Sequence, residues 1–191
     1  MLLTVPNILT WLRIGLIPVF SGIYYFPDTW LSTHAKDWIG MLIFLLAAIT
    51  DWFDGYLARR LGQTSAFGAF LDPVADKLMV AAALIMLVQL GRADALLAIV
   101  IIGREITISA LREWMAKVGQ ARSVAVSFLG KVKTLAQMIA IVLLLLHEPI
   151  VPWIDTAWAG TICLWIATII TLWSMIYYLR LAVPHIAEGD P

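Results

Sequence analysis

Charged residues are scarce in this sequence. Asp, Glu, Lys and Arg make up 14% of its 191 residues, whereas they make up about 25% of a typical soluble domain. Hydrophobic residues account for 62%. This balance indicates an integral membrane protein rather than a soluble one, and the length predicts one domain covering residues 1–191.

Other absences narrow the function. The single cysteine, Cys163, excludes an internal disulfide. The formal net charge is zero, so there is no overall positive field that would attract nucleic acid. The first residues, MLLTVPNILT, lack the basic segment and the small-residue cleavage site of a signal peptide. We therefore expect no secretory leader and no nucleic-acid partner.

The sequence contains several long hydrophobic segments. A helix needs about 20 mostly apolar residues to cross a membrane. Six segments approach that length: Ile8–Phe26, Trp38–Arg59, Ala66–Leu90, Ala93–Met115, Phe128–Leu146 and Trp158–Leu181. They predict an all-α membrane protein with six transmembrane helices.

Charge in five of these segments is concentrated near one end. It comes early in the first, third and fifth segments and late in the second and fourth. Because successive membrane spans run in opposite directions, all of these charges would lie on one side of the membrane. A charge within hydrocarbon costs at least about 2.5 kcal/mol unless it faces a partner or a cavity. We therefore predict that the six helices surround a polar cavity that opens to that side.

The side of the membrane follows from the basic residues. Only Lys36 and Arg92 lie opposite the predicted cavity, and the other basic residues lie on its side: Arg13, Arg59, Arg60, Lys77, Arg104, Arg112, Lys117, Arg122, Lys131, Lys133 and Arg180. Loops rich in Lys and Arg stay in the cytoplasm. We therefore expect the cavity and both termini on the cytoplasmic side.

Four aspartates mark the mouth of the predicted cavity. Asp51 and Asp54 are three residues apart, and Asp72 and Asp76 are four apart, so each pair shares one face of a helix. Four neighbouring carboxylates repel one another unless cations neutralise them. Mg²⁺ and Mn²⁺ prefer oxygen ligands and commonly bind together with substrate phosphates. The pattern predicts a metal site that handles a diphosphate, although Asp72 before Pro73 is also typical of a helix N-cap.

Small residues accompany the aspartates. Gly55 and Ala58 follow Asp51 by four and seven residues, so the helix face beside the carboxylate is nearly bare. Such a face admits a ligand close to the backbone, or it allows close helix packing. Gly68 has the same potential, and Arg59 adds a guanidinium suited to phosphate oxygens.

These positions together resemble the signature of the CDP-alcohol phosphotransferases. All eight fixed positions are present, as Asp51-x2-Asp54-Gly55-x2-Ala58-Arg59-x8-Gly68-x3-Asp72-x3-Asp76. The resemblance covers nearly the whole chain, through stretches such as VPNILTWLRIGLIP, FGAFLDPVADK and REITISALREWMA. It implies a multi-pass enzyme of the bacterial inner membrane, commonly a homodimer. It also implies transfer of the phosphatidyl group of CDP-diacylglycerol to sn-glycerol 3-phosphate, which gives phosphatidylglycerophosphate and CMP.

The resemblance also implies roles for individual residues. Two divalent ions would be held by the four aspartates, and Asp76 would act as the general base. The implied CDP-diacylglycerol site comprises Asp54, Gly55, Ala58, Arg59, Thr64 and Gly68.

The acceptor is a phosphate dianion, so its site should contain cations. Arg104 and Arg112 are eight residues apart and share a helix face. Alternatively, Arg104 pairs with Glu105 and Arg112 anchors the helix at the membrane surface. Lys131 and Lys133 face different sides of their helix, and we expect Lys131 to reach the site.

Three further residues have less defined roles. We expect Lys133 to extend toward lipid headgroups. Thr10 and Arg13 would lie at the floor of the cavity or contact lipid phosphate.

Two other functions compete with this interpretation. A related transferase would use another acceptor, such as inositol phosphate. A divalent-cation transporter would need polar residues across the whole membrane thickness, whereas the half opposite the cavity is nearly free of charge.

Overall fold

The computed structural model describes residues 5–61, 66–117, 128–148 and 155–188. In these ranges the chain forms six α-helices: α1 (Val5–Ile23), α2 (Thr33–Leu61), α3 (Ala66–Gln89), α4 (Ala95–Lys117), α5 (Phe128–Leu146) and α6 (Thr156–Glu188). The six predicted segments each correspond to one helix. The all-α prediction is therefore confirmed for the described part of the chain.

Helix N-caps explain where three of the helices begin. The Ala35 N–H donates to the Ser32 hydroxyl over 3.3 Å at the start of α2. Asp94 accepts from the Leu96 N–H over 2.7 Å at the start of α4, and Asp155 accepts from Ala157 N–H over 2.9 Å at the start of α6. Each cap satisfies a backbone donor that has no partner within its helix.

The cap on α2 corrects one predicted boundary. Residues 27–37 were expected to form a connection, but α2 begins at Thr33, so its second half is helical. At the other end of the chain, α6 continues to Glu188, beyond the predicted Leu181.

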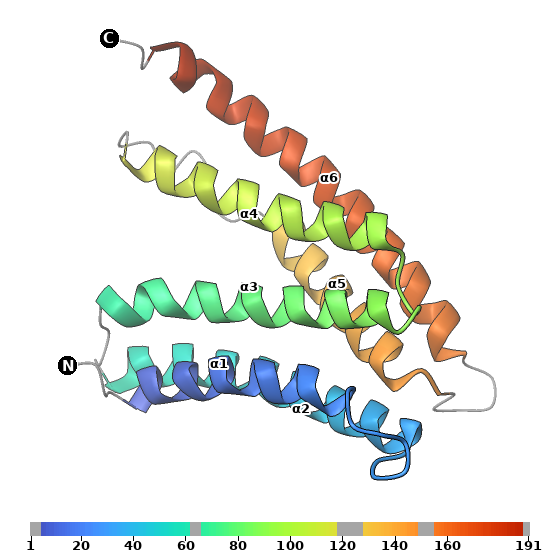
Figure 1. Ribbon diagram of the computed structural model, residues 1–191. Coiled ribbons are helices and arrows are strands. Elements are labelled where there is room, and N and C mark those ends of the chain that lie inside the picture. The colour runs from blue at the N-terminus through green and yellow to red at the C-terminus, as the bar shows by residue number, and fades with distance from the viewer. Residues whose placement is uncertain (1–4, 62–65, 118–127, 149–154, 189–191) are drawn as a thin grey trace.

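The helices alternate in direction, which gives the bundle two distinct ends (Figure 1). Helices α2, α4 and α6 begin at the end drawn on the right, which we call the capped end. Helices α1 and α3 begin, and α2, α4 and α6 end, at the opposite side, which we call the aspartate end. The charge-bearing halves of α1 to α4 therefore lie toward the same end of the molecule, as the sequence pattern predicts.

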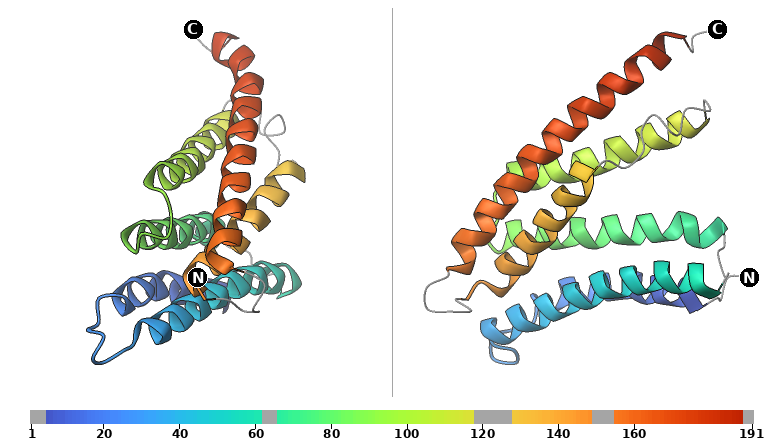
Figure 2. Two further views of the ribbon diagram at one scale, coloured as in Figure 1. Left: turned by 90° about the vertical axis from the view of Figure 1, so that its right-hand side faces the viewer. Right: turned by 180° about the vertical axis from the view of Figure 1, so that it is seen from behind.

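The apolar core lies mainly in the capped half. It includes Phe44, Leu84, Leu87, Ile101 and Leu144, each at most 1% exposed. A second, smaller cluster joins α4 to α6 through Ile108, Met115, Tyr178 and Ala182. Toward the aspartate end, α4 and α6 diverge from α1, α2 and α3 (Figures 1 and 2).

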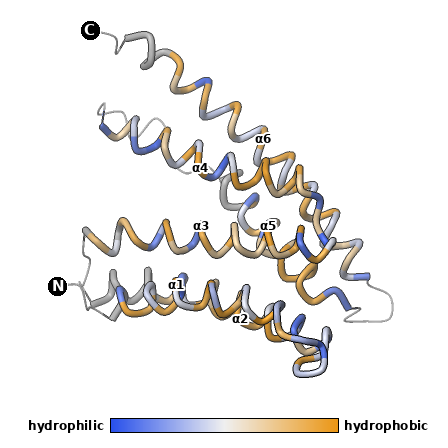
Figure 3. The backbone as a smooth tube through the Cα atoms, in the orientation of Figure 1, coloured by the Kyte–Doolittle hydropathy of each residue, from blue (hydrophilic) through white to orange (hydrophobic). Residues whose placement is uncertain are grey.

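Two of the described helices are long and apolar enough to cross a membrane. These segments are Thr33–Asp51 in α2 and Thr156–Val183 in α6, and shorter apolar segments cover Asn7–Ile23 and Val132–Leu146. Hydrophilic residues interrupt α3 and α4 within the helices (Figure 3). Helices α3 and α4 have 24 and 23 residues, which is enough to cross a membrane. Their charged residues, rather than their lengths, therefore lower their apolarity.

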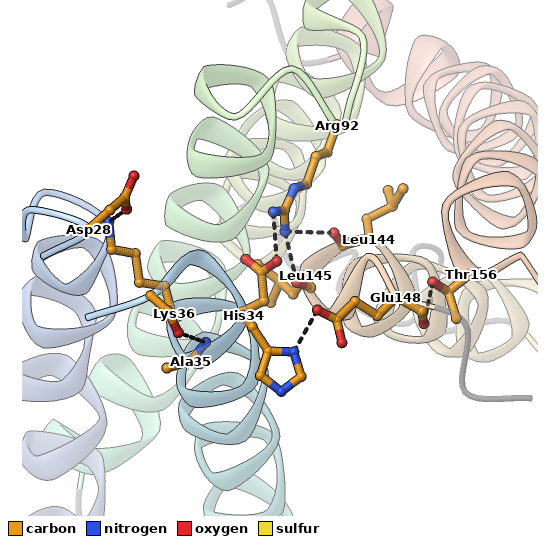
Figure 4. A network of polar contacts seen from close by, with 11 residues as sticks. Asp28, His34, Ala35, Lys36, Arg92, Leu144, Leu145, Glu148 and Thr156 are labelled. Carbon is orange, nitrogen blue, oxygen red and sulfur yellow. Dashed lines mark hydrogen bonds and ion pairs between the residues drawn. The ribbon is translucent and has the colours of Figure 1, made fainter. Parts of the chain in front are cut away.

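A polar network ties the helices together at the capped end (Figure 4). Arg92 donates to Asp37 over 2.7 Å and to the Leu145 carbonyl over 2.9 Å. Nearby, Lys36 donates to Asp28 over 2.6 Å. Lys36 and Arg92 are the two cations that the sequence placed opposite the aspartates, and both occur at this end.

Candidate active site

A buried arginine on α1 contacts the first aspartate of the signature. Arg13 Nη1 donates to Asp51 Oδ1 on α2 over 2.5 Å. The Arg13 side chain is 1% exposed, whereas that of Asp51 is 44% exposed. A buried guanidinium needs a charged partner to offset its lost hydration. The half-exposed carboxylate satisfies this need and still has room for another ligand.

A threonine one turn earlier contacts the third aspartate. Thr10 Oγ1 donates to Asp72 Oδ1 on α3 over 2.5 Å. Asn7, Thr10 and Arg13 recur every three residues, and they are 2%, 0% and 1% exposed. We call these three residues the α1 polar stripe. It brings aspartates from two different helices to one face of α1.

The position of Asp72 excludes the N-cap interpretation. Helix α3 begins at Ala66, and Pro73 lies inside it. Asp72 is therefore an interior residue whose carboxylate points to α1 rather than capping its own helix. Pro73 lacks the backbone N–H that an interior position normally uses.

Asp76, one turn after Asp72, faces a different neighbourhood. It lines a small pocket between α3, α4 and α5, together with Lys77, Val80, Glu105, Thr134, Gln137 and Met138. Asp76 is also within electrostatic reach of Asp51 and Arg13. It therefore lies between the aspartates held by α1 and the polar residues of α4 and α5.

Two cations on the far side of this pocket share one carboxylate. Glu105 Oε1 accepts from Arg104 Nη1 over 3.0 Å and also from the ammonium of Lys133. Arg104 Nη2 donates to the Ser174 hydroxyl on α6 over 2.9 Å. Arg104 therefore pairs with Glu105, and the acceptor role expected for Arg104 stays a prediction. The expectation that Lys133 extends toward headgroups is wrong, because its side chain is buried and joined to α4 by this shared carboxylate.

Arg112 completes the group of cations. Its guanidinium lies over the Tyr178 ring, 5.4 Å from the centroid, which is within the range of a cation–π contact. Lys133 is within electrostatic reach of both Arg104 and Arg112. We call Arg104, Arg112 and Lys133 the cation cluster. Glu105 binds Arg104 and Lys133 directly, so the three positive charges of the cluster exceed the single negative charge of Glu105.

Several predicted site residues lie outside the described part of the structure. The side chains of Asp54, Gly55, Ala58 and Arg59 on α2, and of Lys131 on α5, are among them, as is all of Thr64. Gly68 is buried in the first turn of α3. The roles predicted for all of these positions stay predictions.

Comparison with known proteins places this geometry in a family. The sequence model of the CDP-alcohol phosphatidyltransferases matches residues 3–173. The chain belongs to this family. It is 49% identical over 180 residues to the CDP-diacylglycerol–glycerol-3-phosphate 3-phosphatidyltransferase of Escherichia coli strain K12, covering 93% of this chain and 94% of that protein. The protein of the same name from Salmonella paratyphi A is 48% identical over the same length.

The donor set of this member of the family fits a hard divalent cation. Asp51, Asp72 and Asp76 supply only carboxylate oxygens, which Mg²⁺ and Mn²⁺ prefer. Within the described residues, no three acidic, histidine or cysteine side chains are grouped closely enough to hold an ion by themselves. The expected set also includes Asp54, whose side chain lies outside those residues. The chemistry of the ligands therefore agrees with a metal site, and the expectation of two ions stays a prediction.

Sequence reasoning missed part of the site. Gln137 lines the Asp76 pocket and follows Lys133 by four residues in an apolar run, so helical spacing could have identified it. Asn7 similarly precedes Thr10 by three residues. Nothing local marks Ser174 or Tyr178, because their contacts depend on how α6 packs against α4.

Proposed function

We propose that this chain transfers the phosphatidyl group of CDP-diacylglycerol to sn-glycerol 3-phosphate, which gives phosphatidylglycerophosphate and CMP for the synthesis of phosphatidylglycerol and cardiolipin. One observation carries the proposal: Asp76 lines a pocket with Glu105, and Glu105 in turn binds two members of the cation cluster. On one side, the carboxylates would bind the nucleotide diphosphate through divalent cations. On the other side, the cation cluster would bind the phosphate of the acceptor. The 49% identity to an enzyme with this name supports it.

The reaction requires one proton transfer and one displacement. Asp76 accepts the proton of the glycerol hydroxyl, and the oxygen then attacks the phosphorus that carries diacylglycerol. A new phosphorus–oxygen bond forms to glycerol 3-phosphate, and the bond from that phosphorus to the oxygen bridging to CMP breaks. CMP leaves with the electron pair of the broken bond. None of the assigned residues serves as a covalent nucleophile, so we favour direct displacement.

The acceptor phosphate would bind at the cation cluster. Arg104, Arg112 and Lys133 come from two helices, and their charge exceeds that of Glu105. A dianion would balance this excess while the glycerol hydroxyls extend toward Asp76. Glu105 holds both Arg104 and Lys133, which fixes their positions before the acceptor arrives. An acceptor without a phosphate, such as zwitterionic serine, would not balance this excess positive charge.

The donor substrate would bind at the aspartate end of α2 and α3. Asp51, Asp54, Asp72 and Asp76 would hold Mg²⁺ or Mn²⁺, and Gly55, Ala58, Arg59, Thr64 and Gly68 would surround the cytidine diphosphate. When bound, the divalent cations would offset the charge of the diphosphate and of the departing CMP.

The membrane setting is part of the same proposal. All six helices would cross the bacterial cytoplasmic membrane, with the aspartate end, the cavity and both termini on the cytoplasmic side. The charged residues lie early in α1 and α3 and late in α2 and α4, and the alternating directions of these helices bring those halves to one end (Figure 1), which supports this orientation. The enzyme would act as a homodimer among the membrane lipids that include its substrate.

An acceptor assay with the purified full-length chain tests the function. CDP-diacylglycerol in mixed micelles is incubated with Mg²⁺ or Mn²⁺ and with one acceptor at a time: glycerol 3-phosphate, inositol phosphate, serine or phosphatidylglycerol. We expect CMP release with glycerol 3-phosphate and a requirement for the metal. Release only with inositol phosphate would favour the related transferase, and no release with any acceptor and metal would refute the proposal.

A further inference from the structure

The α1 polar stripe lies outside the family signature, yet it contacts two of the signature aspartates. Thr10 and Arg13 are fully buried, and among their contacts Thr10 donates to Asp72 and Arg13 donates to Asp51, each over 2.5 Å. We propose that these two residues position the metal-binding carboxylates: Thr10 fixes the orientation of Asp72, and Arg13 balances the charge of Asp51 until a divalent cation does so. This inference rests on the proposed function, because it takes Asp51 and Asp72 as metal ligands.

Thr10 is placed to set the direction of a ligand. Its hydroxyl occupies Asp72 Oδ1, so the rotation of that carboxylate is restricted while Oδ2 is left for another partner. Helices α1 and α3 pack against each other, and the burial of Thr10 excludes water as a competing donor. Partners that orient a metal ligand in this way typically change metal affinity by about 10- to 100-fold when they are removed.

Arg13 affects the metal site mainly through its positive charge, and less through the orientation of the Asp51 carboxylate. It binds Asp51 directly and is within electrostatic reach of Asp76 as well. Without a cation, these carboxylates repel each other, and the guanidinium reduces that repulsion. Once a divalent ion binds, the same guanidinium repels the ion. Removing the charge of Arg13 should therefore destabilise the metal-free protein and strengthen metal binding.

Removing the Thr10 hydroxyl should therefore weaken metal binding, whereas removing the Arg13 charge should strengthen it. A purely structural role would predict neither change, because lost packing lowers stability equally with and without metal. The sign of the change therefore separates positioning from packing.

The experiment measures Mn²⁺ binding to the full-length chain in detergent, without substrate, by the electron paramagnetic resonance signal of free Mn²⁺. Thermal unfolding is recorded with and without Mn²⁺. The test variants are Thr10→Val, Thr10→Ser, Arg13→Gln and Arg13→Lys. The control for Thr10→Val is Thr107→Val, because the Thr107 hydroxyl bonds only its own helix at Gly103 in the contacts described. The control for Arg13→Gln is Arg92→Gln, which breaks a buried Arg–Asp pair at the capped end.

We expect Thr10→Val to weaken Mn²⁺ binding by about tenfold or more, and Thr10→Ser to restore it. Arg13→Gln should bind Mn²⁺ about tenfold more tightly than the wild type, and Mn²⁺ should raise its unfolding temperature more. Arg13→Lys should resemble the wild type. Arg92→Gln should lose stability equally with and without Mn²⁺, and Thr107→Val should not change.

Several results would overturn the inference. These are a wild type that binds no Mn²⁺, a Thr10→Val variant with unchanged affinity, and an Arg13→Gln variant with unchanged or weaker affinity. If Arg13→Gln folds only with Mn²⁺ present, the charge role is supported; failure to fold in both conditions contradicts it. Wild-type protein that binds Mn²⁺ but releases no CMP would refute the proposed function alone. CMP release with unaltered variant affinities would refute this inference alone.

Discussion

Arg92 donates from Nη2 to Asp37 Oδ2 over 2.7 Å, and both side chains are less than 10% exposed. Gly91 makes this contact possible: its φ of 69° ends α3 and turns the chain toward α4, a backbone angle that glycine adopts without strain. Arg92 also donates to the last turn of α5. One guanidinium therefore joins α2, the α3–α4 turn and α5 at the capped end.

Removing Asp37 should destabilise the bundle. Asp37→Ala leaves a buried guanidinium without its charged partner, which costs about 3–5 kcal/mol. Unfolding in detergent measures the loss. The matched control is Glu113→Ala, which removes an ion pair to Lys117 in which both side chains are more than 70% exposed, so its effect should stay below about 1 kcal/mol. Equal stability of the two variants would contradict the role of the Arg92–Asp37 pair.

A close approach at Gly40 gives a second stability prediction. A Cβ at this position would overlap the Tyr24 hydroxyl oxygen, so Gly40→Ala forces the ring to move and should cost about 1–3 kcal/mol. Gly22→Ala is the control, because nothing lies within 4 Å of its added Cβ. Adding Tyr24→Phe to Gly40→Ala should recover part of the loss. If it recovers nothing, the hydroxyl is not the source of the clash.

The sequence predicts the helices well because apolar length and the placement of charge are local properties. Phe128–Leu146 coincides with α5, and the predicted start of the third helix at Ala66 coincides with α3. The start of α2 was missed because Thr33–Asp37 is polar, although Ser32 is a recognisable N-cap. Patterns of apolar residues locate the buried middle of a helix better than its polar ends.

Contacts between helices were harder to predict. The sequence pattern placed Arg13 on the cavity side, at its floor or against lipid phosphate, but could not assign it to Asp51, because that contact joins residues 38 positions apart. The choice between Lys131 and Lys133 required knowing how α5 is rotated against α4. Their spacing only established that they face different sides. The structure describes Lys133 in contact with Glu105, while the prediction for Lys131 stays open.

Arg112 should contribute mainly to acceptor binding. Its guanidinium stacks on Tyr178, and its Nε is buried without a hydrogen-bond partner among the described residues. Arg112→Ala should raise the apparent KM for glycerol 3-phosphate by about tenfold or more, as expected for a lost charged hydrogen bond. The KM for CDP-diacylglycerol should change little. Arg112→Lys should fall in between, because lysine keeps the charge but loses the planar fork. An unchanged KM in Arg112→Ala would leave phosphate binding to Arg104 and the lysines.

Asp76 should be needed for turnover but not for binding of the donor substrate. Its pocket adjoins Glu105, and through Glu105 the cation cluster, so a hydroxyl of an acceptor held there would lie near its carboxylate. An amide cannot accept the proton, and Asp76→Asn should therefore lower CMP release by at least about a hundredfold. CDP-diacylglycerol binding should persist, because Asp51, Asp54 and Asp72 remain. Asp94→Asn is the matched control: it makes the same chemical change at the capped end, where asparagine also serves as an N-cap, and it should keep wild-type turnover. Normal turnover in Asp76→Asn would remove Asp76 as the base, whereas loss of CDP-diacylglycerol binding would assign it to the donor site instead.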